Sequence, residues 1–236
     1  MNENKKAVWV TGASSGIGKA IAESFVKNGF HVIATARRID LLSELKNSLD
    51  NSKLLETFQL DIKNEEEIEK FISSINSESE IDCLINNAGV TSFKKAVDDS
   101  LPEIEEIINT NLLGSIYTIK KVLPEMIARK SGTIINVLSV VTKKIFTSSS
   151  AYSASKAGLL AYTNVLREEV RDKNIRVINI SPGATRTDIW PESAREKYSQ
   201  RMMNAEAIAD LILKVYLEKS NLVAEEIVIR PISGDL

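Results

Sequence analysis

Cysteine and histidine are almost absent from this chain of 236 residues, which contains one of each. Cys83 alone cannot form an intramolecular disulfide, and one cysteine and one histidine cannot build the clusters that hold most structural metals, so we expect no metal site. A Ser-His-Asp triad could use only His31, which begins an apolar stretch and is expected to be structural.

The chain also lacks an excess of either charge. Its 30 Lys and Arg residues face 32 Asp and Glu residues, for a formal net charge of −2. This balance argues against nucleic acid or a membrane surface as a partner. No apolar run approaches the ~18 residues of a membrane-spanning helix, and residues 1–6 lack the apolar stretch of a signal peptide. We therefore expect a globular, cytoplasmic protein.

Short apolar runs alternate with longer amphipathic stretches along the whole chain. The runs are rich in Val and Ile and mostly apolar on both faces, as in buried parallel strands. They cover residues 7–11, 31–36, 53–60, 81–86, 133–138, 176–181 and 226–230. Helical patterns cover residues 16–28, 41–49, 65–77, 102–129, 151–173 and 205–219. The alternation predicts one α/β domain over residues 1–236, with a doubly wound parallel sheet of about seven strands and helices on both faces.

A glycine-rich turn follows the first predicted strand and opens the first helix. Its glycines are spaced Gly-x-x-x-Gly-x-Gly, and its candidate ligand-binding residues are Gly12, Ser14, Ser15, Gly16, Ile17 and Gly18. Glycine permits a tight turn and lets the backbone approach a phosphate, and the helix N-terminus offers free N–H groups. The strand-turn-helix context indicates a Rossmann-type dinucleotide site; the alternative is a glycine-rich turn without a ligand.

Two arginines follow the second predicted strand. An NAD-binding domain usually has an acidic residue here for the ribose 2′-hydroxyl, whereas arginine suits the 2′-phosphate of NADP. Arg37 is the first candidate because it comes directly after the strand, and Arg38 can share the phosphate or lie along the adenine. Asp40 is expected to be the N-cap of the next helix. The alternative is that both arginines are solvated surface charges.

A series of motifs over residues 11–187 resembles the short-chain dehydrogenases/reductases. Besides the glycine motif, it comprises Asp61-Ile62, Asn86-Asn87-Ala88-Gly89, Asn111, Ser139, Tyr152-Ser153-Ala154-Ser155-Lys156 and Pro182-Gly183-Ala184-Thr185-Arg186-Thr187. The resemblance implies an NADP(H)-dependent oxidoreductase acting on CH–OH groups, with a catalytic tetrad of Asn111, Ser139, Tyr152 and Lys156.

The same resemblance implies the other binding roles. Asp61 and Ile62 would contact the adenine, and Asn87, Ala88 and Gly89 would line the cofactor. Tyr152 and Lys156 would contact the nicotinamide ribose, while Pro182, Gly183, Thr185 and Thr187 would hold the carboxamide and diphosphate. Residues 186–203, with Trp190, Tyr198, Met202 and Met203, would form a lid. The helices over 102–129 and 151–173 would form a homodimer or homotetramer.

The chemistry of the Tyr152–Lys156 pair can also be argued from the residues. Hydride transfer to a carbonyl leaves an alkoxide that needs a proton, and a tyrosine can donate it. A lysine four residues later projects from the same helix face, and its charge is expected to lower the tyrosine pKa. Ser139, at a strand end, can hydrogen-bond the substrate oxygen, and by resemblance Asn111 holds a water that connects Lys156 to solvent.

Two other functions remain open at this stage. A non-catalytic NADP-binding regulator would need no proton donor, and a sugar-nucleotide epimerase usually needs a longer C-terminal region than the residues that follow Thr187. The favoured substrate is a small ketone, aldehyde or 3-hydroxy/3-oxo acid.

Overall fold

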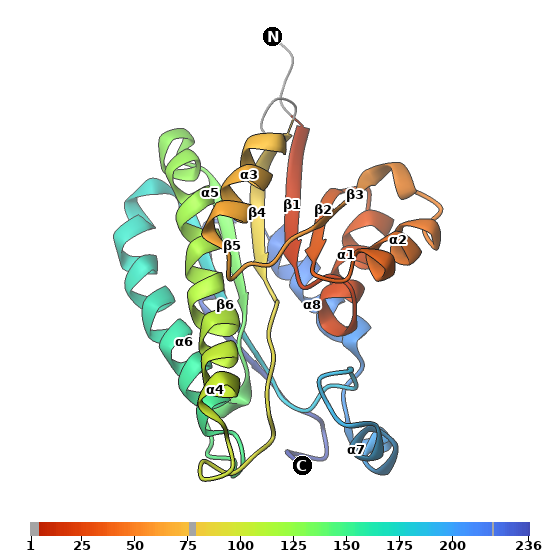
Figure 1. Ribbon diagram of the computed structural model, residues 1–236. Coiled ribbons are helices and arrows are strands. Elements are labelled where there is room, and N and C mark those ends of the chain that lie inside the picture. The colour runs from red at the N-terminus through yellow and green to blue at the C-terminus, as the bar shows by residue number, and fades with distance from the viewer. Residues whose placement is uncertain (1–4, 76–78, 219) are drawn as a thin grey trace.

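The computed structural model describes residues 5–75, 79–218 and 220–236. Its core is one sheet of seven parallel strands in the order β3-β2-β1-β4-β5-β6-β7 (Figure 1). The strands are β1 (Lys5–Thr11), β2 (His31–Ala36), β3 (Leu55–Gln59), β4 (Ser79–Asn86), β5 (Gly132–Val137), β6 (Ile175–Pro182) and β7 (Glu226–Ile229). The predicted doubly wound α/β class is confirmed.

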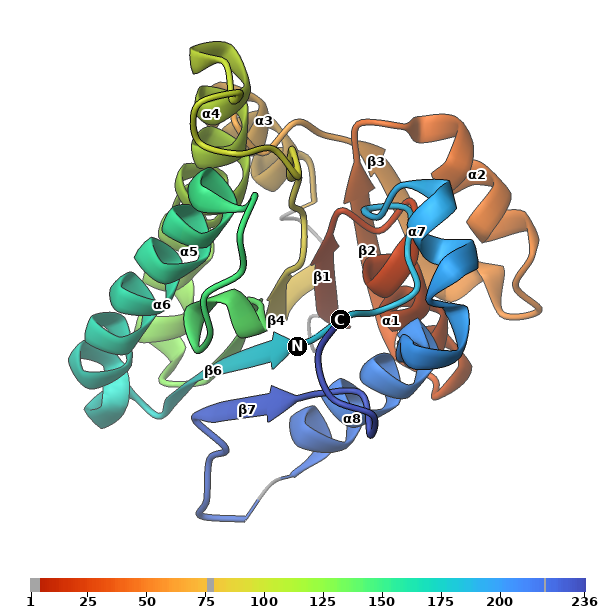
Figure 2. The same cartoon turned by 90° about the horizontal axis from the view of Figure 1, so that it is seen from below.

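Helices cover both faces of this sheet (Figures 1 and 2). One face packs against α1 (Gly16–Lys27), α2 (Ile39–Asn47) and α8 (Ala205–Leu217), and the other against α3 (Glu65–Ile75), α5 (Ser115–Arg129) and α6 (Ser150–Val170). Val8 and Val10 of β1 point into the first layer, whereas Trp9 points into the second. Because both faces are covered, the inner strands β2 and β5 are buried at every position, whereas the edge strands β3 and β7 are partly exposed.

Shorter helical segments lie in the connections. They are the 3₁₀ turns η1 (Ser52–Leu54), η3 (Val140–Thr142), η4 (Arg171–Lys173) and η5 (Ser199–Arg201), and the helices α4 (Leu101–Ile108) and α7 (Glu192–Lys197). A π-helical segment, η2 (Asn109–Gly114), joins α4 to α5. The predicted helix over residues 102–129 is thus three successive segments. π-helical insertions often occur at functional sites, and this one contains Asn111.

Other predicted boundaries also differ from the structure. The third strand begins at Leu55 because Ser52–Leu54 forms a 3₁₀ turn. Asp40 is not an N-cap: α2 begins at Ile39 with Arg38 at the N-cap, and Asp40 lies in the first turn, where its charge favours the helix dipole. Residues 1–4, 76–77 and 219, on which the signal-peptide expectation and two predicted helix ends depend, lie outside the described residues.

Three buried asparagines form a ladder across the middle of the sheet. Asn86, Asn136 and Asn179 are paired in register on β4, β5 and β6. Asn86 Nδ2 donates to Asn136 Oδ1 at 3.2 Å, and Asn136 Nδ2 donates to Asn179 Oδ1 at 3.1 Å. Thr118 and Thr163 donate to the two ends of the ladder from the covering helices. A slip of one residue would leave these amides without partners, so the ladder fixes the register.

Candidate active site

A cavity of about 820 Å³ opens where the parallel strands end at their carboxyl termini. Open α/β sheets bind ligands at this edge. All the residues predicted for the site, except Asn111 and Gly18, line the cavity. The lining set is Gly12, Ser14, Ser15, Gly16, Ile17, Arg37, Arg38, Asp61, Ile62, Asn87, Ala88, Gly89, Ser139, Tyr152, Lys156, Pro182, Gly183, Thr185 and Thr187.

The glycine-rich turn brings backbone close to two neighbouring loops. Gly12 and Gly16 have φ angles of +66° and +56°, in the left-handed region that favours glycine. A Cβ on Gly12 would lie 2.7 Å from Cα of Ala88, and one on Gly16 would lie 3.0 Å from the Thr187 side chain. Gly18 faces protein rather than the cavity, since its Cβ would lie 2.3 Å from Nδ2 of Asn87.

The N-terminus of α1 faces the same turn without a side-chain cap. Ser15 at the N-cap makes no capping hydrogen bond, and the first turn of the helix has no acidic residue. The first N–H groups of a helix have no partner within the helix. This end of α1 can therefore bind an anionic group such as a phosphate.

Thr11 connects the glycine turn to the loop after β4 through hydrogen bonds, a role that the sequence analysis missed. Its Oγ1 accepts hydrogen bonds from the backbone N–H groups of Asn87 and Ala88 at 3.1 and 3.2 Å. Asn87 Nδ2 in turn donates to the carbonyl oxygens of Thr11 and Gly12. The only sequence signal was the hydroxyl residue immediately before Gly12.

The two arginines after β2 have different partners. Arg38 Nη2 donates to Oγ of Ser14 at 3.0 Å and to Oγ of Ser15 at 2.8 Å, which places its guanidinium over the glycine-rich turn. Arg37 Nη1 instead pairs with Glu106 Oε1 of α4 at 2.9 Å, and 54% of its side chain is exposed. Glu106 also accepts from Lys63 Nζ, and this hydrogen bond lowers the pKa of the Glu106 carboxyl.

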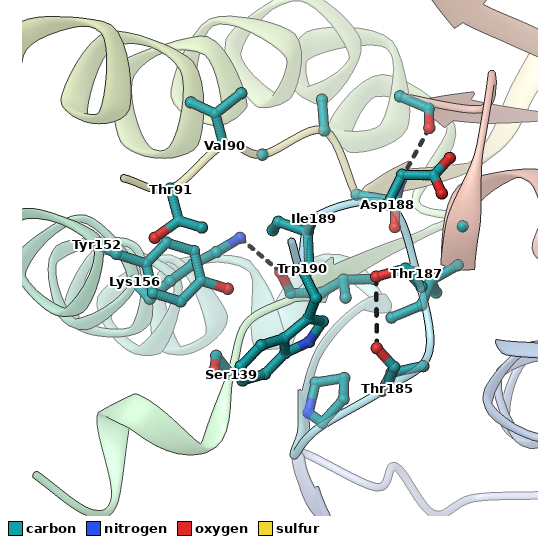
Figure 3. Close-up of a pocket in the computed structure, with 18 of the residues that line it drawn as sticks. Val90, Thr91, Ser139, Tyr152, Lys156, Thr185, Thr187, Asp188, Ile189 and Trp190 are labelled. Atoms are coloured by element: carbon teal, nitrogen blue, oxygen red, sulfur yellow. Dashed lines mark hydrogen bonds between the residues drawn. The ribbon is translucent and has the colours of Figure 1, made fainter. Parts of the chain in front are cut away.

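The opposite end of the cavity holds Ser139, Tyr152 and Lys156. Tyr152 and Lys156 lie near the start of α6 and Ser139 follows β5, and Figure 3 shows the three side chains converging on one space. Lys156 Nζ lies 5.8 Å from the centroid of the Tyr152 ring and donates to the carbonyl oxygen of Val137 at 2.9 Å. Lys156 is 4% exposed.

Burial is the main cause of the pKa shifts of Lys156 and Tyr152. It lowers the pKa of Lys156 to about 8. It raises the pKa of Tyr152, and a hydrogen bond with Ser139 opposes the rise. The pKa of Tyr152 is thus raised, not lowered as expected from the charge of Lys156, because desolvation of the phenolate is the largest influence on it. At neutral pH Tyr152 holds its proton, as a general acid must.

Asn111 lies behind this group rather than in the cavity. It is fully buried in the π-helical segment, where its Oδ1 accepts from the N–H of Val90 at 2.8 Å. Its Nδ2 donates to the carbonyl oxygen of Val90 at 2.9 Å and to Oγ of Ser155 at 3.0 Å. The side chain thus ties the loop after β4 to α6, and protein atoms occupy both its donors and its acceptor.

Backbone hydrogen bonds join the two ends of the segment over residues 186–203. Thr185 and Met203 form a β-bridge, and hydrogen bonds run from Arg186 N to Met203 O and from Met203 N to Ala184 O. Trp190 and Tyr198 line the cavity. The two methionines do not: Met202 is buried, and Met203 packs against the apolar core.

Several lining residues lay outside the predicted set. Thr91 and Thr110 line the cavity, and each has a buried Oγ1 without a hydrogen-bond partner. Phe93 also lines it. The described residues contain no group of three His, Cys, Asp or Glu side chains placed to hold a metal ion. None of the helices in the described part of the chain has the length and apolar character to span a bilayer.

Comparison with known proteins gives consistent matches over nearly the whole chain. The model of the short chain dehydrogenase family matches residues 6–198. A sepiapterin reductase of Chlorobaculum tepidum is 32% identical over 98% of both chains, and a farnesol dehydrogenase of Aedes aegypti is 33% identical over 96% of both. A solved structure of the closed form of serine dehydrogenase complexed with NADP⁺ has a TM-score of 0.91 and 30% identity, over 98% of this chain and 96% of that one.

Proposed function

This chain belongs to the short chain dehydrogenase family, and we propose that it is an NADP(H)-dependent oxidoreductase that interconverts a small carbonyl compound and its alcohol. The observation that carries the proposal is the convergence of half-buried Ser139 and Tyr152 with buried Lys156 at one end of a cavity whose other end suits an anion. The NADP⁺ complex of the similar serine dehydrogenase supports the choice of cofactor.

The residues of the cavity fit a dinucleotide. The uncapped N-terminus of α1 and the glycine turn suit a pyrophosphate, and Arg38 with Ser14 and Ser15 suits a 2′-phosphate. The unpartnered Oγ1 of Thr110 adds a hydrogen-bonding group in the same cavity. Asp61 and Ile62 would border the adenine, and the loops around Asn87 and Gly183 would border the remaining parts. Bound nicotinamide would supply the hydride.

In this reaction the protein would supply the proton for the substrate oxygen and a positive charge that stabilises the resulting phenolate. Tyr152 would donate its proton to the oxygen of the carbonyl as negative charge develops there, because its raised pKa keeps it protonated at neutral pH. Ser139 would donate a hydrogen bond to the same oxygen. Lys156, with a pKa of about 8, is mainly cationic at pH 7 and would favour the phenolate that Tyr152 becomes.

A purely regulatory NADP-binding protein is the alternative, and the burial of Lys156 argues against it. Burying a cation without a carboxylate partner destabilises the fold. Contact with the nicotinamide ribose could use Lys156, but cofactor binding alone does not require a tyrosine proton donor and the Ser139 hydroxyl beside that cation.

We also propose a homodimer or homotetramer of single-domain subunits in the cytoplasm, where the nicotinamide pool would be available. Val165 on α6 is 59% exposed, which gives this helix an apolar residue on its outer surface. Light scattering at micromolar concentration should give a multiple of the chain mass; the mass of one chain would contradict the assembly.

Replacing Tyr152 with Phe tests the proposed chemistry directly. We expect turnover of a panel of ketones, aldehydes and 3-oxo esters, measured as loss of NADPH absorbance, to fall ~10²- to 10⁴-fold. NADPH affinity and the circular dichroism spectrum should stay unchanged, because the ring is retained. Tyr162→Phe on the same helix, outside the cavity, is the matched control. Near-parental turnover in a folded Tyr152→Phe protein would contradict the proposal.

A further inference from the structure

Two aromatic side chains that take no part in the proposed proton transfer meet at the substrate end of the cavity. Phe93 comes from the loop between β4 and α4, and Trp190 from the loop between β6 and α7. Their ring centroids lie 4.8 Å apart with an interplanar angle of 31°, and both residues line the cavity. Figure 3 labels Trp190 together with Ser139 and Tyr152 among the side chains that line the cavity.

The backbone at Phe93 adopts a conformation that bulky residues avoid. Its φ is +52°, in the left-handed region. The ring nevertheless stays 37% exposed, so burial in the core does not explain the conformation. With this backbone conformation, the phenyl ring of Phe93 packs against the indole of Trp190. Strained backbone of this kind is found where a side chain must be held in a particular place.

The charges near this aromatic pair disfavour an acidic substrate. Among the described lining residues, the cations are Lys156, bonded to Val137, and the two arginines at the other end of the cavity. Asp188 and Asp235 also line the cavity, and each is ion-paired, Asp188 with Arg195 at 2.7 Å and Asp235 with Arg230. Lys144 stands 3.1 Å from Asp235, so its charge is already neutralised by that carboxylate. Because the carboxylates of Asp188 and Asp235 already hold these cations, a substrate carboxylate near the aromatic pair would have to compete with them for a charged partner.

From this geometry we propose that Phe93 and Trp190 form the specificity subsite, which selects carbonyl compounds with a flat, uncharged aromatic group and disfavours those with a carboxylate. The proposal rests on the proposed function, because it places the reacting carbonyl at Tyr152. With the carbonyl there, a substituent on one side lies against the indole. An aromatic group gains from offset stacking beyond its apolar burial, whereas a saturated ring of similar size gains burial alone.

Three ketones that differ only at the far end test this subsite. They are 4-phenylbutan-2-one, 4-cyclohexylbutan-2-one and 4-(4-carboxyphenyl)butan-2-one, whose carbonyl groups are not conjugated to the ring. We expect kcat/KM for the phenyl ketone to exceed that for the cyclohexyl ketone by about 3- to 10-fold. The carboxyphenyl ketone should fall below the phenyl ketone by about 10-fold or more.

Variants of the pair should remove the preference selectively. Trp190→Leu and Phe93→Leu should bring kcat/KM for the phenyl ketone down to that for the cyclohexyl ketone, whose own value changes by less than about twofold. Val97→Ala is the matched control, because Val97 lies in the same loop as Phe93 and is 87% exposed. It should leave all three values unchanged.

Fluorescence gives a readout that does not depend on turnover. The chain has two tryptophans, and Trp9 is fully buried in the core. With NADP⁺ present to prevent reduction, the phenyl ketone should quench emission of the parent at lower concentration than the cyclohexyl ketone, and Trp190→Leu should abolish the quenching.

The outcomes separate the two proposals. Turnover of all three ketones at equal efficiency would overturn the subsite and leave the proposed oxidoreductase standing. Without turnover of any of them, phenyl-selective quenching would still support the subsite and would count against the proposed reaction for these ketones. Equal quenching by the phenyl and cyclohexyl ketones, or none by either, would overturn the subsite.

Discussion

The two ends of the cavity are built on opposite principles. At the tyrosine end, Lys156 is buried and Ser139 and Tyr152 are half-buried, and desolvation is the largest cause of the pKa shifts of the tyrosine and the lysine. The arginine end, comprising Arg37 and Arg38 with the serines of the glycine turn, is open, and its charges interact through side-chain hydrogen bonds and ion pairs.

The difference shows how one cavity can combine chemistry with selectivity. In a desolvated site, electrostatic interactions are strong and a misplaced group is costly, which suits bond making. In an exposed site, water and salt weaken each contact, so a single charged contact changes the affinity for a ligand only modestly. Substitutions at the tyrosine end should therefore have larger effects than those at the arginine end.

The largest effect should come from Lys156→Met, which should reduce activity while stabilising the fold. We expect turnover to fall about 10²- to 10⁴-fold, since the charge that favours the phenolate is lost. The free energy of unfolding at pH 7 should rise by about 1–3 kcal/mol, because a buried cation without a carboxylate partner is replaced by an apolar side chain of similar length. Urea unfolding of both proteins measures the difference.

The pH dependence of that difference provides an internal check. The folded pKa of Lys156 is about 8, below its ordinary value of 10.5, so the native state loses this proton first as pH rises. The parental protein should therefore gain stability between about pH 8 and 10.5, and the advantage of Lys156→Met should be full below pH 8 and vanish above this window. Lys120→Met, on the exposed side of α5, should change stability by less than about 0.5 kcal/mol. A pH-independent difference would contradict the assignment.

The sequence predicted which residues line the cavity better than it predicted the surroundings of their side chains. The alternation of strands and helices along the chain and the lining of the cavity follow from apolar periodicity and from motifs that lie within single strand-to-loop junctions. Nothing local reveals that desolvation raises the pKa of Tyr152, because the cavity around it is lined by residues from distant parts of the chain. The asparagine ladder was missed for the same reason: its members are 43 and 50 residues apart in sequence.

The choice between the arginines shows the same limit. Sequence position favoured Arg37, which directly follows β2. Its side chain, however, meets Glu106, a residue 69 positions away on α4. Side-chain direction at a strand end is set by such distant partners, so position alone could not decide which guanidinium faces the cofactor site.

A smaller effect should come from Arg38→Ala, at the arginine end. We expect the ratio of kcat/KM with NADPH to that with NADH to fall by about 10- to 100-fold, since a hydrogen bond to a charged group contributes about 1.5–3 kcal/mol. The loss should fall on NADPH, while NADH values stay within about twofold. Added salt should erode the preference of the parental protein, because this end of the cavity is open to solvent.

Arg37→Ala is the matched control for that substitution, since it removes the same charge one residue away. The guanidinium of Arg37 is already neutralised by Glu106, and exposed pairs of this kind contribute about 0–1 kcal/mol, so the cofactor ratio should change by less than about threefold. Equal losses in the two variants would mean that net positive charge, rather than the contact geometry at Ser14 and Ser15, sets the preference. A larger loss in Arg37→Ala would mean that Arg37 exchanges Glu106 for the phosphate when the cofactor binds, and Glu106→Gln should then strengthen NADPH binding by releasing it.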